Sequence, residues 1–168
     1  AATAVRPPAG MTPGRFEDRN KFYKRLLEAS PVGKYGSTFQ RESFVRAMDN
    51  AHRLLASPAA KAFDLSREDP RVVEKYGDGY GRDALIARRL VEAGVPFVKV
   101  ARAWWDSHGQ NFETHQEMVP ELDHVLSVLL EDLQERGLLK NTLVVTFSEM
   151  GRTPAINASL GRDPPCDV

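Results

Sequence analysis

The chain has 168 residues, which is enough for one domain with at most a small second one. It contains 23 Lys and Arg residues and 23 Asp and Glu residues, so its formal net charge is zero. This balance argues against nucleic-acid binding through bulk electrostatics and against a polybasic membrane-surface protein, because both need surplus positive charge. No apolar run approaches the ~20 residues of a membrane-spanning helix. The single cysteine, Cys166, cannot form an internal disulfide. We therefore expect no nucleic-acid partner and no membrane span.

The N-terminal half has a helical pattern that proline and glycine interrupt. Residues 1–13 are rich in both and predict a linker or a disordered segment. Residues 14–81 predict an irregular helical region that packs on a sheet. The apolar spacing places helices over residues 15–29, 37–56 and 70–76. The ends of the last helix are the clearest, because Asp69 is a good N-cap, Pro70 suits the first helical position and Gly77 ends the pattern.

The second half alternates between helix and strand patterns. Helices are expected over residues 82–93 and from Pro120 to the residue before Gly137, and strands over residues 95–101 and 142–147. The second strand is apolar enough to be buried on both faces. The order helix, strand, helix, strand predicts a right-handed βαβ unit. The predicted fold is therefore α/β, a mainly parallel sheet with flanking helices, with its core in residues 82–163 and an atypical tail at 164–168.

Polar residues follow both predicted strands. Asp106 and His108 come after the first strand, and Glu149 comes after the second. Ligands bind at the carboxyl ends of parallel strands, so these side chains are expected to converge. Asp106 and His108 are two residues apart and point the same way in an extended stretch. Imidazole and carboxylate suit zinc, manganese or iron. We predict a divalent-metal site formed by Asp106, His108, Glu149 and His115.

Arg152 is the candidate for substrate binding, because a guanidinium group pairs with phosphate or sulfate through several N–H donors. A simpler interpretation stays open, in which Asp106 caps a turn and His108 is solvated. The nucleophile is unknown, since neither Ser107 nor Ser148 stands in a nucleophile-elbow context.

Several segments between Phe44 and Asp163 share motifs with one known protein family. They are Ala62-Phe63-Asp64-Leu65-Ser66, Ala84 to Val98, Trp105-Asp106-Ser107-His108, Pro120-Glu121-Leu122-Asp123, Leu130-Glu131-Asp132-Leu133, Thr142-Leu143-Val144-Val145, Glu149 to Pro154 and Ile156-Asn157. Together they resemble a family of bacterial proteins that carry the domain of unknown function fifteen-zero-one.

That family is similar to the alkaline phosphatase and sulfatase superfamily. The resemblance implies an α/β sheet between helices, a divalent-metal site at the strand ends and hydrolysis of small phosphate or sulfate esters, often by exported or periplasmic proteins. Asp106 and His108 match the Trp-Asp-x-His motif of the family and are its implied metal ligands, and Glu149 lies where the superfamily often keeps an acidic ligand. Such cations stabilise the attacking and leaving oxygens. Zinc, manganese and calcium are not distinguished.

The sequence departs from the family pattern in three places. The pattern continues Gly-Arg-Asp-His-Trp, whereas Asp163 is followed here by Pro164, so an implied histidine ligand is missing. The front of the family fold, which holds the first ligands and the nucleophile, is also missing, and Trp104 replaces a small residue. A truncation near Asp163 would explain the end. We interpret the chain as an incomplete fragment of a metal-dependent phosphatase-like or sulfatase-like hydrolase, inactive alone. The alternative is a non-catalytic α/β module with a structural or partner-binding role. The oligomeric state is not predicted.

Overall fold

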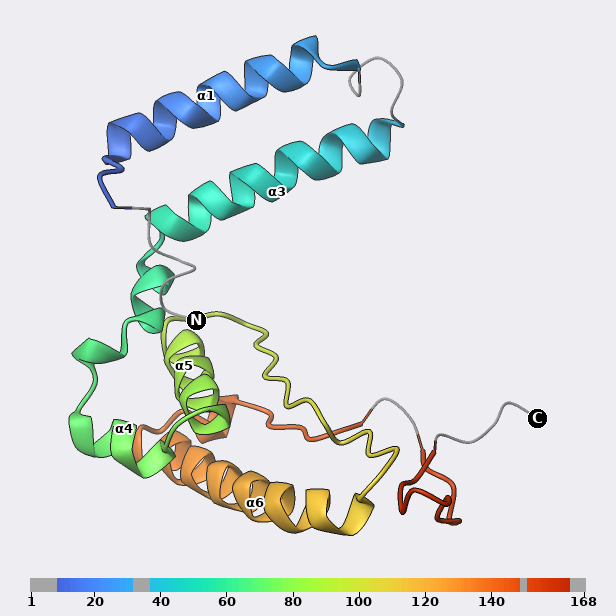
Figure 1. Cartoon of the computed structure of the whole chain (residues 1–168). Coiled ribbons are helices and arrows are strands. Elements are labelled where there is room, and N and C mark those ends of the chain that lie inside the picture. Colours follow the sequence, from blue (N-terminus) through green and yellow to red (C-terminus); the bar gives the residue numbers. More distant parts are fainter. Residues whose placement is uncertain (1–8, 32–36, 149–150, 164–168) are drawn as a thin grey trace. The chain divides into compact units, whose positions relative to one another are not determined.

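The computed structural model describes residues 9–31, 37–148 and 151–163, without the side chains of residues 41, 44, 48, 56 and 58. Glu149, the tail at 164–168 and most of the predicted linker lie outside the described residues. The chain divides into two compact units, Ala1–Leu65 and Ser66–Val168. In Figure 1 the first unit contains α1 and α3, and the second contains α4, α5 and α6.

The first unit is built on a pair of antiparallel helices, α1 (Pro13–Ala29) and α3 (Thr38–Ala56), which run side by side in Figure 1. Both helices begin after a residue whose side-chain hydroxyl caps the helix. The Thr12 hydroxyl accepts from the Arg15 amide, and Ser37 forms a reciprocal capping box with Gln40. These caps satisfy amides that have no partner within their own helix, which fixes where each helix starts.

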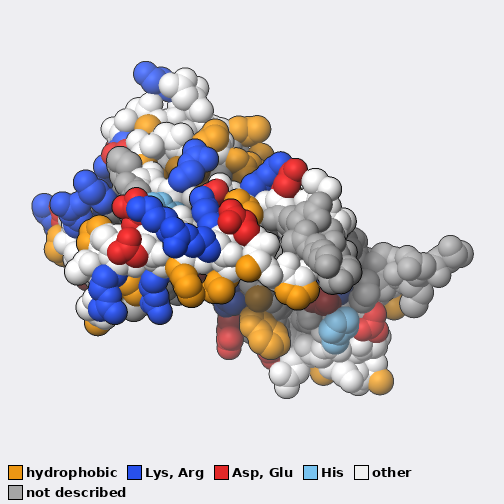
Figure 2. Space-filling view, turned by 90° about the horizontal axis from the view of Figure 1, so that it is seen from above, with side chains coloured by type: hydrophobic (Ala, Val, Ile, Leu, Met, Phe, Trp, Pro, Cys, Tyr) orange, Lys and Arg blue, Asp and Glu red, His pale blue; other side chains and the backbone are white. Residues whose placement is uncertain are grey.

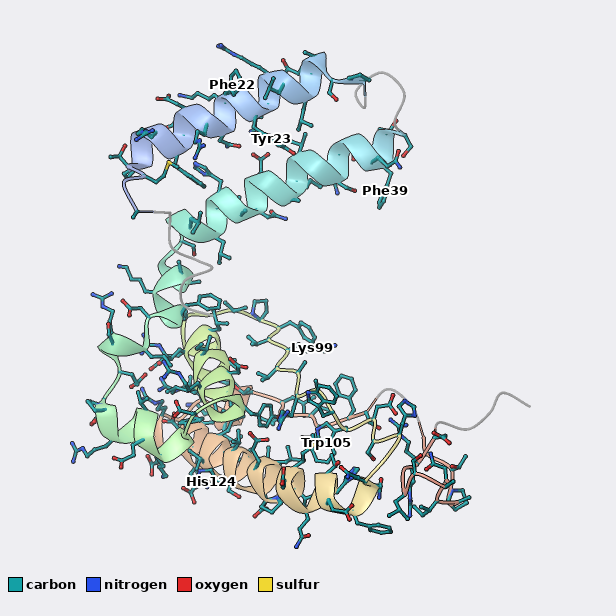
Figure 3. All side chains as sticks on the ribbon, in the orientation of Figure 1. Phe22, Tyr23, Phe39, Lys99, Trp105 and His124 are labelled. Carbon is teal, nitrogen blue, oxygen red and sulfur yellow. The ribbon has the colours of Figure 1, made fainter. Side chains whose placement is uncertain are left out.

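Two contacts join the described side chains of α1 and α3 in different ways. The rings of Phe16 and His52 stack with their centroids 5.1 Å apart, and the Lys24 ammonium lies 2.8 Å from the Asp49 carboxylate. Phe22 and Phe39, labelled in Figure 3, are 61% and 79% exposed. The described part of this pair of helices thus combines an aromatic stack and an ion pair with large apolar side chains that are exposed to solvent.

The second unit contains three helices and short 3-10 turns. After α3, the first unit ends with η1 (Pro58–Phe63), and η2 (Leu65–Arg67) begins at its last residue. The second unit continues with α4 (Pro70–Tyr76), α5 (Tyr80–Glu92), α6 (Asn111–Glu135) and η3 (Leu139–Asn141). The predicted limits of α4 are confirmed. Asp69 Oδ1 accepts from the Arg71 amide at 2.9 Å, and Gly77 ends the helix with φ 76°, a backbone region that favours glycine. None of the described helices is long and apolar enough to cross a bilayer.

Helices α4 and α5 both pack on α6. Their facing sides supply the buried apolar residues Tyr76, Ala84, Leu85, Ile86, Ala87, Met118, Val125, Val128 and Leu133. His124 joins the same elements at the surface, where its Nε2 donates to the Lys75 carbonyl at 2.9 Å (Figure 3). The core of this unit is therefore helix against helix.

A buried arginine on α5 forms ion pairs with residues of the surrounding elements. The Arg88 guanidinium is fully buried and lies 2.7 Å from Glu68, 2.7 Å from Glu92 and 2.8 Å from Asp132. Asp132 also accepts from the Tyr76 hydroxyl at 3.0 Å and pairs with Arg136 at 2.6 Å. A buried charge needs such partners, because an unpaired ion in the interior costs several kcal/mol.

The prediction of an α/β fold with a mainly parallel sheet is wrong. Among the described residues, the one β-bridge is an isolated antiparallel pair, Gly109 with Leu160. Residues 95–101 and 142–147 carry no strand assignment and run as irregular traces in Figure 1. A β-branched sequence favours an extended backbone, but a sheet also needs a neighbouring strand in register, and within the described chain neither segment has one.

The start of α6 also differs from the prediction. The helix begins at Asn111, so Pro120 lies inside it rather than at its first position. Met118 and Val125 are both buried seven residues apart, on one side of a continuous helix. These buried residues lie on both sides of Pro120. The stabilisation from burying them outweighs the cost of the backbone hydrogen bond that proline cannot donate.

Candidate functional site

Two loops of the second unit are joined along their backbones. The Arg162 amide donates to the Ser107 carbonyl at 2.8 Å, and the Asn111 amide donates to the Leu160 carbonyl at 2.8 Å. Between them, Gly109 and Leu160 form the isolated bridge. The segment that leads into α6 is therefore fixed to the segment 157–163, although the two are about 50 residues apart in the sequence.

This junction brings together four side chains of alternating charge, which we call the charged cluster: Asp106, His108, Arg152 and Asp163. His108 Nε2 lies 3.1 Å from Asp106 Oδ1, and His108 Nδ1 lies 3.1 Å from Asp163 Oδ1. Arg152 Nη1 pairs with Asp106 Oδ1 and donates to the Arg162 carbonyl at 3.2 Å. The three side chains of Asp106, His108 and Asp163 are about half exposed, so the cluster is open to small molecules.

Asn157 holds the cluster in place. Its Nδ2 donates to the His108 carbonyl at 3.0 Å and to both carboxylate oxygens of Asp163, at 3.2 and 3.1 Å. Its Oδ1 accepts from the amides of Ser159 and Gly161. One amide side chain thus fixes both the turn 157–161 and the two residues that face each other across the junction.

The charges of the cluster shift one another's protonation. The hydrogen bond from Arg152 lowers the pKa of Asp106, with a smaller contribution from His108. The hydrogen bond to Asp163, together with the charge of Asp106, raises the pKa of His108. The hydrogen bonds from His108 and Asn157 lower the pKa of Asp163. Since a carboxylate only accepts hydrogen bonds, the doubly protonated imidazolium satisfies both contacts of His108.

The residues predicted to bind a metal have different surroundings. Asp106 and His108 do come together. His115 lies on α6, where its Nδ1 donates to the Asn111 carbonyl at 2.7 Å and its ring meets the edge of Trp105 at 5.4 Å. Glu149 lies outside the described residues. Arg152, predicted to bind substrate, pairs with Asp106.

The donor types of the charged cluster suit a divalent cation, but their arrangement does not. Two carboxylates and an imidazole are ligands that zinc and manganese accept. However, each ring nitrogen of His108 faces a different carboxylate, so the three groups do not point at one position. The part of the chain that the structure describes contains no group of three or more His, Cys, Asp or Glu side chains placed to hold a metal ion. Metal binding therefore stays a prediction.

Asp163 and Asn157 are site residues that the sequence reasoning missed. Both lie in the tight segment 157–163, whose link to His108 is a long-range contact that no local pattern reveals. The available signal was Gly161 two residues before Asp163, because glycine allows a close approach of two backbones.

Trp104 has an unusual backbone in the approach to this site. Its φ is 77°, in the left-handed region, and its side chain is 76% exposed. A bulky residue rarely adopts such a conformation, which favours glycine. A glycine at this position would remove this strain.

Comparison with known proteins gives one match. A model of the family described as "Protein of unknown function (DUF1501)" matches residues 1–165, almost the whole chain. No curated protein and no solved structure matches the chain.

Proposed function

We propose that this chain, which belongs to the DUF1501 family of proteins of unknown function, carries part of a hydrolase site for phosphate or sulfate esters, formed by the charged cluster. One observation carries the proposal. Asp106 and His108 contact each other, and each contacts a second group of opposite charge from residues 152–163. If Asp106 merely capped a turn and His108 were solvated, there would be no reason for this convergence.

Arg152 is the group proposed to bind the anionic part of the ester. Within the described part of the chain, its contacts with Asp106 and with the Arg162 carbonyl both use Nη1. A guanidinium has five N–H donors, so Nε and Nη2 can still bind two oxygens of a phosphate or sulfate. Its pairing with Asp106 orients the group before the substrate arrives.

His108 is proposed as the proton donor to the leaving group. A water oxygen bonds to the phosphorus or sulfur atom, and the bond from that atom to the ester oxygen breaks. The leaving oxygen takes a ring proton from His108, and the attacking water loses its proton to the solvent. The hydrogen bond to Asp163 and the charge of Asp106 raise the pKa of His108, which increases the share of imidazolium, the form that a general acid requires.

This proposal departs from the expectation that the fragment is inactive alone, because His108 and Arg152, the groups that it uses, both lie in this chain. Hydrolysis of p-nitrophenyl phosphate and p-nitrophenyl sulfate by the full chain tests it. Replacing a general acid or an anion-binding arginine should lower the rate at least about 100-fold, so we expect that loss in His108→Gln and in Arg152→Gln. Arg82→Gln is the matched control, because Arg82 is a surface arginine paired only with Asp78, at 3.4 Å, among the described residues. The control should stay within about twofold of the wild-type rate.

The same assay is run with a chelator and with added zinc or manganese. Dependence of the rate on the cation would support the predicted metal. The proposal fails if the wild-type chain hydrolyses neither ester under any of these conditions, or if the control loses as much activity as the two variants. That result would leave the non-catalytic, structural or partner-binding role.

A further inference from the structure

The backbone has an unusual conformation at three places beside the charged cluster. Among the described residues, three that are not glycine have a φ in the left-handed region: Trp104 at 77°, Gln110 at 51° and Leu160 at 60°. Each lies within three residues of a member of the charged cluster. Such residues persist only where the surrounding structure holds them, and they gather at ligand sites and switches. The strained residues of the described chain are therefore concentrated where the charged cluster forms.

Leu160 occupies a turn position at which glycine is usual. The Leu160 amide donates to the Asn157 carbonyl at 3.0 Å, and the Asn157 amide donates to the Gly161 carbonyl at 2.9 Å. The last residue of such a short turn takes the left-handed conformation, which suits glycine. The Leu160 side chain is 52% exposed, and the exposed Gln110 side chain makes no capping hydrogen bond to α6. Side-chain burial therefore gives little support to either conformation.

Backbone hydrogen bonds hold both residues in place. We call three backbone donors at the junction the latch amides: those of Gln110, Asn111 and Arg162. They donate to the carbonyls of Ser159, Leu160 and Ser107 at 3.1, 2.8 and 2.8 Å, respectively. When these bonds break, the left-handed conformations are no longer imposed, so opening of the junction releases strain.

Other contacts across the junction are weak. The buried apolar residues of the described second unit all lie outside residues 105–111 and 151–163. Two ion pairs cross the junction, Asp106 with Arg152 and His108 with Asp163. The side chains of His108 and Asp163 are 60% and 50% exposed, and Figure 2 shows a histidine and an acidic side chain together at the surface. Exposed ion pairs contribute little, and low apolar burial is typical of segments that open locally.

We propose that the junction is a latch that regulates the charged cluster: it opens when the latch amides lose their acceptors and closes when an anionic ester binds. The inference rests on the proposed function. His108 lies on one side of the junction and Arg152 on the other, so an oxyanion bound to both holds the two sides together. In the open form the two cations are apart, and the anion loses one of them. An anion that binds the closed form better shifts the population toward that form.

Amide hydrogen exchange of the full chain, followed by NMR, measures the opening of the junction. The three latch amides should share one protection factor, at least about tenfold lower than that of the Leu133 amide in α6, because Leu133 is buried in the core. Protection as high as that of Leu133, or protection that differs among the three latch amides, overturns the latch.

Glycine substitutions test the strain. Leu160→Gly and Gln110→Gly remove the steric cost of the closed form, so each should raise the protection of all three latch amides about two- to fivefold. Ala158→Gly is the matched control, because Ala158 is exposed in the same turn and has no positive φ. It should leave the protection unchanged or lower it, since glycine there only adds freedom to the open chain. An equal rise in the control, or no rise in the two variants, overturns the latch.

Inorganic phosphate tests the coupling between the latch and the charged cluster. At about nine times its dissociation constant, phosphate should raise the protection of the latch amides about tenfold in the wild-type chain. Sodium chloride at the same ionic strength should not, and neither should phosphate added to Arg152→Gln. If phosphate shifts the His108 ring resonances and leaves the protection unchanged, the latch is wrong and the proposed function stands. If phosphate changes neither, while the glycine variants behave as expected, the anion site itself is wrong and the coupling fails with it.

Discussion

Gly161 lies directly against the backbone of His108. A Cβ atom at position 161 would overlap the His108 carbonyl group and the Gly109 amide nitrogen. The close approach lets the amide of Arg162 reach the Ser107 carbonyl and lets Asn157 reach both His108 and Asp163. Glycine is thus required here for close packing of two backbones, and the charged cluster depends on that packing.

Gly161→Ala should separate the segment 157–163 from the segment that leads into α6. The contacts of the charged cluster should then be lost. The added methyl group meets backbone atoms, which cannot move aside as a flexible side chain can. We expect a destabilisation of about 1–3 kcal/mol in urea unfolding and changed amide shifts at residues 107–111. Gly14→Ala is the control, since nothing lies within 4 Å of a Cβ at that position. Unchanged shifts at 107–111 in Gly161→Ala would contradict this packing.

Asp163→Asn should lower the pKa of His108, because the hydrogen bond to Asp163 is the largest cause of its elevation. In the wild-type chain, the stabilisation from the raised His108 pKa is fully present below its usual value of 6.5 and is lost as pH rises through the folded value. The stabilisation from the lowered Asp163 pKa is present above its usual value of 3.8 and is lost as pH falls through the folded value. The pairing of His108 with Asp163 therefore stabilises the fold most between pH 3.8 and pH 6.5.

An NMR titration of the imidazole resonances measures this effect. Asp78→Asn serves as the control, because Asp78 pairs with Arg82 and not with the cluster. If His108 titrates identically in the wild-type chain and in Asp163→Asn, the two side chains are not paired in solution.

Arg88→Met should destabilise the second unit by about 3 kcal/mol or more. The substitution keeps much of the side-chain volume but removes the one fully buried cation that Glu68 and Asp132 share among the described residues. Arg82→Met removes an exposed arginine from the same helix and should change stability by less than about 0.5 kcal/mol. Urea unfolding followed by circular dichroism compares the two. Equal losses would mean that the Arg88 network adds nothing beyond an ordinary surface pair.

Trp104→Gly should be neutral or should stabilise the chain by up to about 1 kcal/mol. Glycine removes the cost of φ 77° at a bulky residue, and the exposed indole loses little packing. Trp105→Gly is the comparison, because the Trp105 ring contacts His115 and that contact is lost. In thermal unfolding, the midpoint temperature of Trp104→Gly should be clearly higher than that of Trp105→Gly. The opposite order would show that Trp104 makes contacts essential to the fold.

Local sequence rules predicted the helices and failed where distant residues decide the structure. The caps of α4 could be read from Asp69, Pro70 and Gly77, since each acts on its own backbone. The prediction of strands at 95–101 and 142–147 was wrong, because a strand needs a partner that the segment itself does not encode. Asp106 and His108 were identified as a pair from their spacing. Asp163 was missed, since its contact with His108 spans 55 residues.

The most direct test of the proposed site is an NMR titration of the full chain with inorganic phosphate. The account predicts saturable shifts of the His108 ring and of the Arg152 guanidinium resonances, because these two groups carry the positive charge of the cluster. The shifts should disappear in Arg152→Gln and persist in Arg82→Gln. Shifts that are absent, or that remain unchanged in Arg152→Gln, would contradict the assignment of the charged cluster as a site for anionic esters.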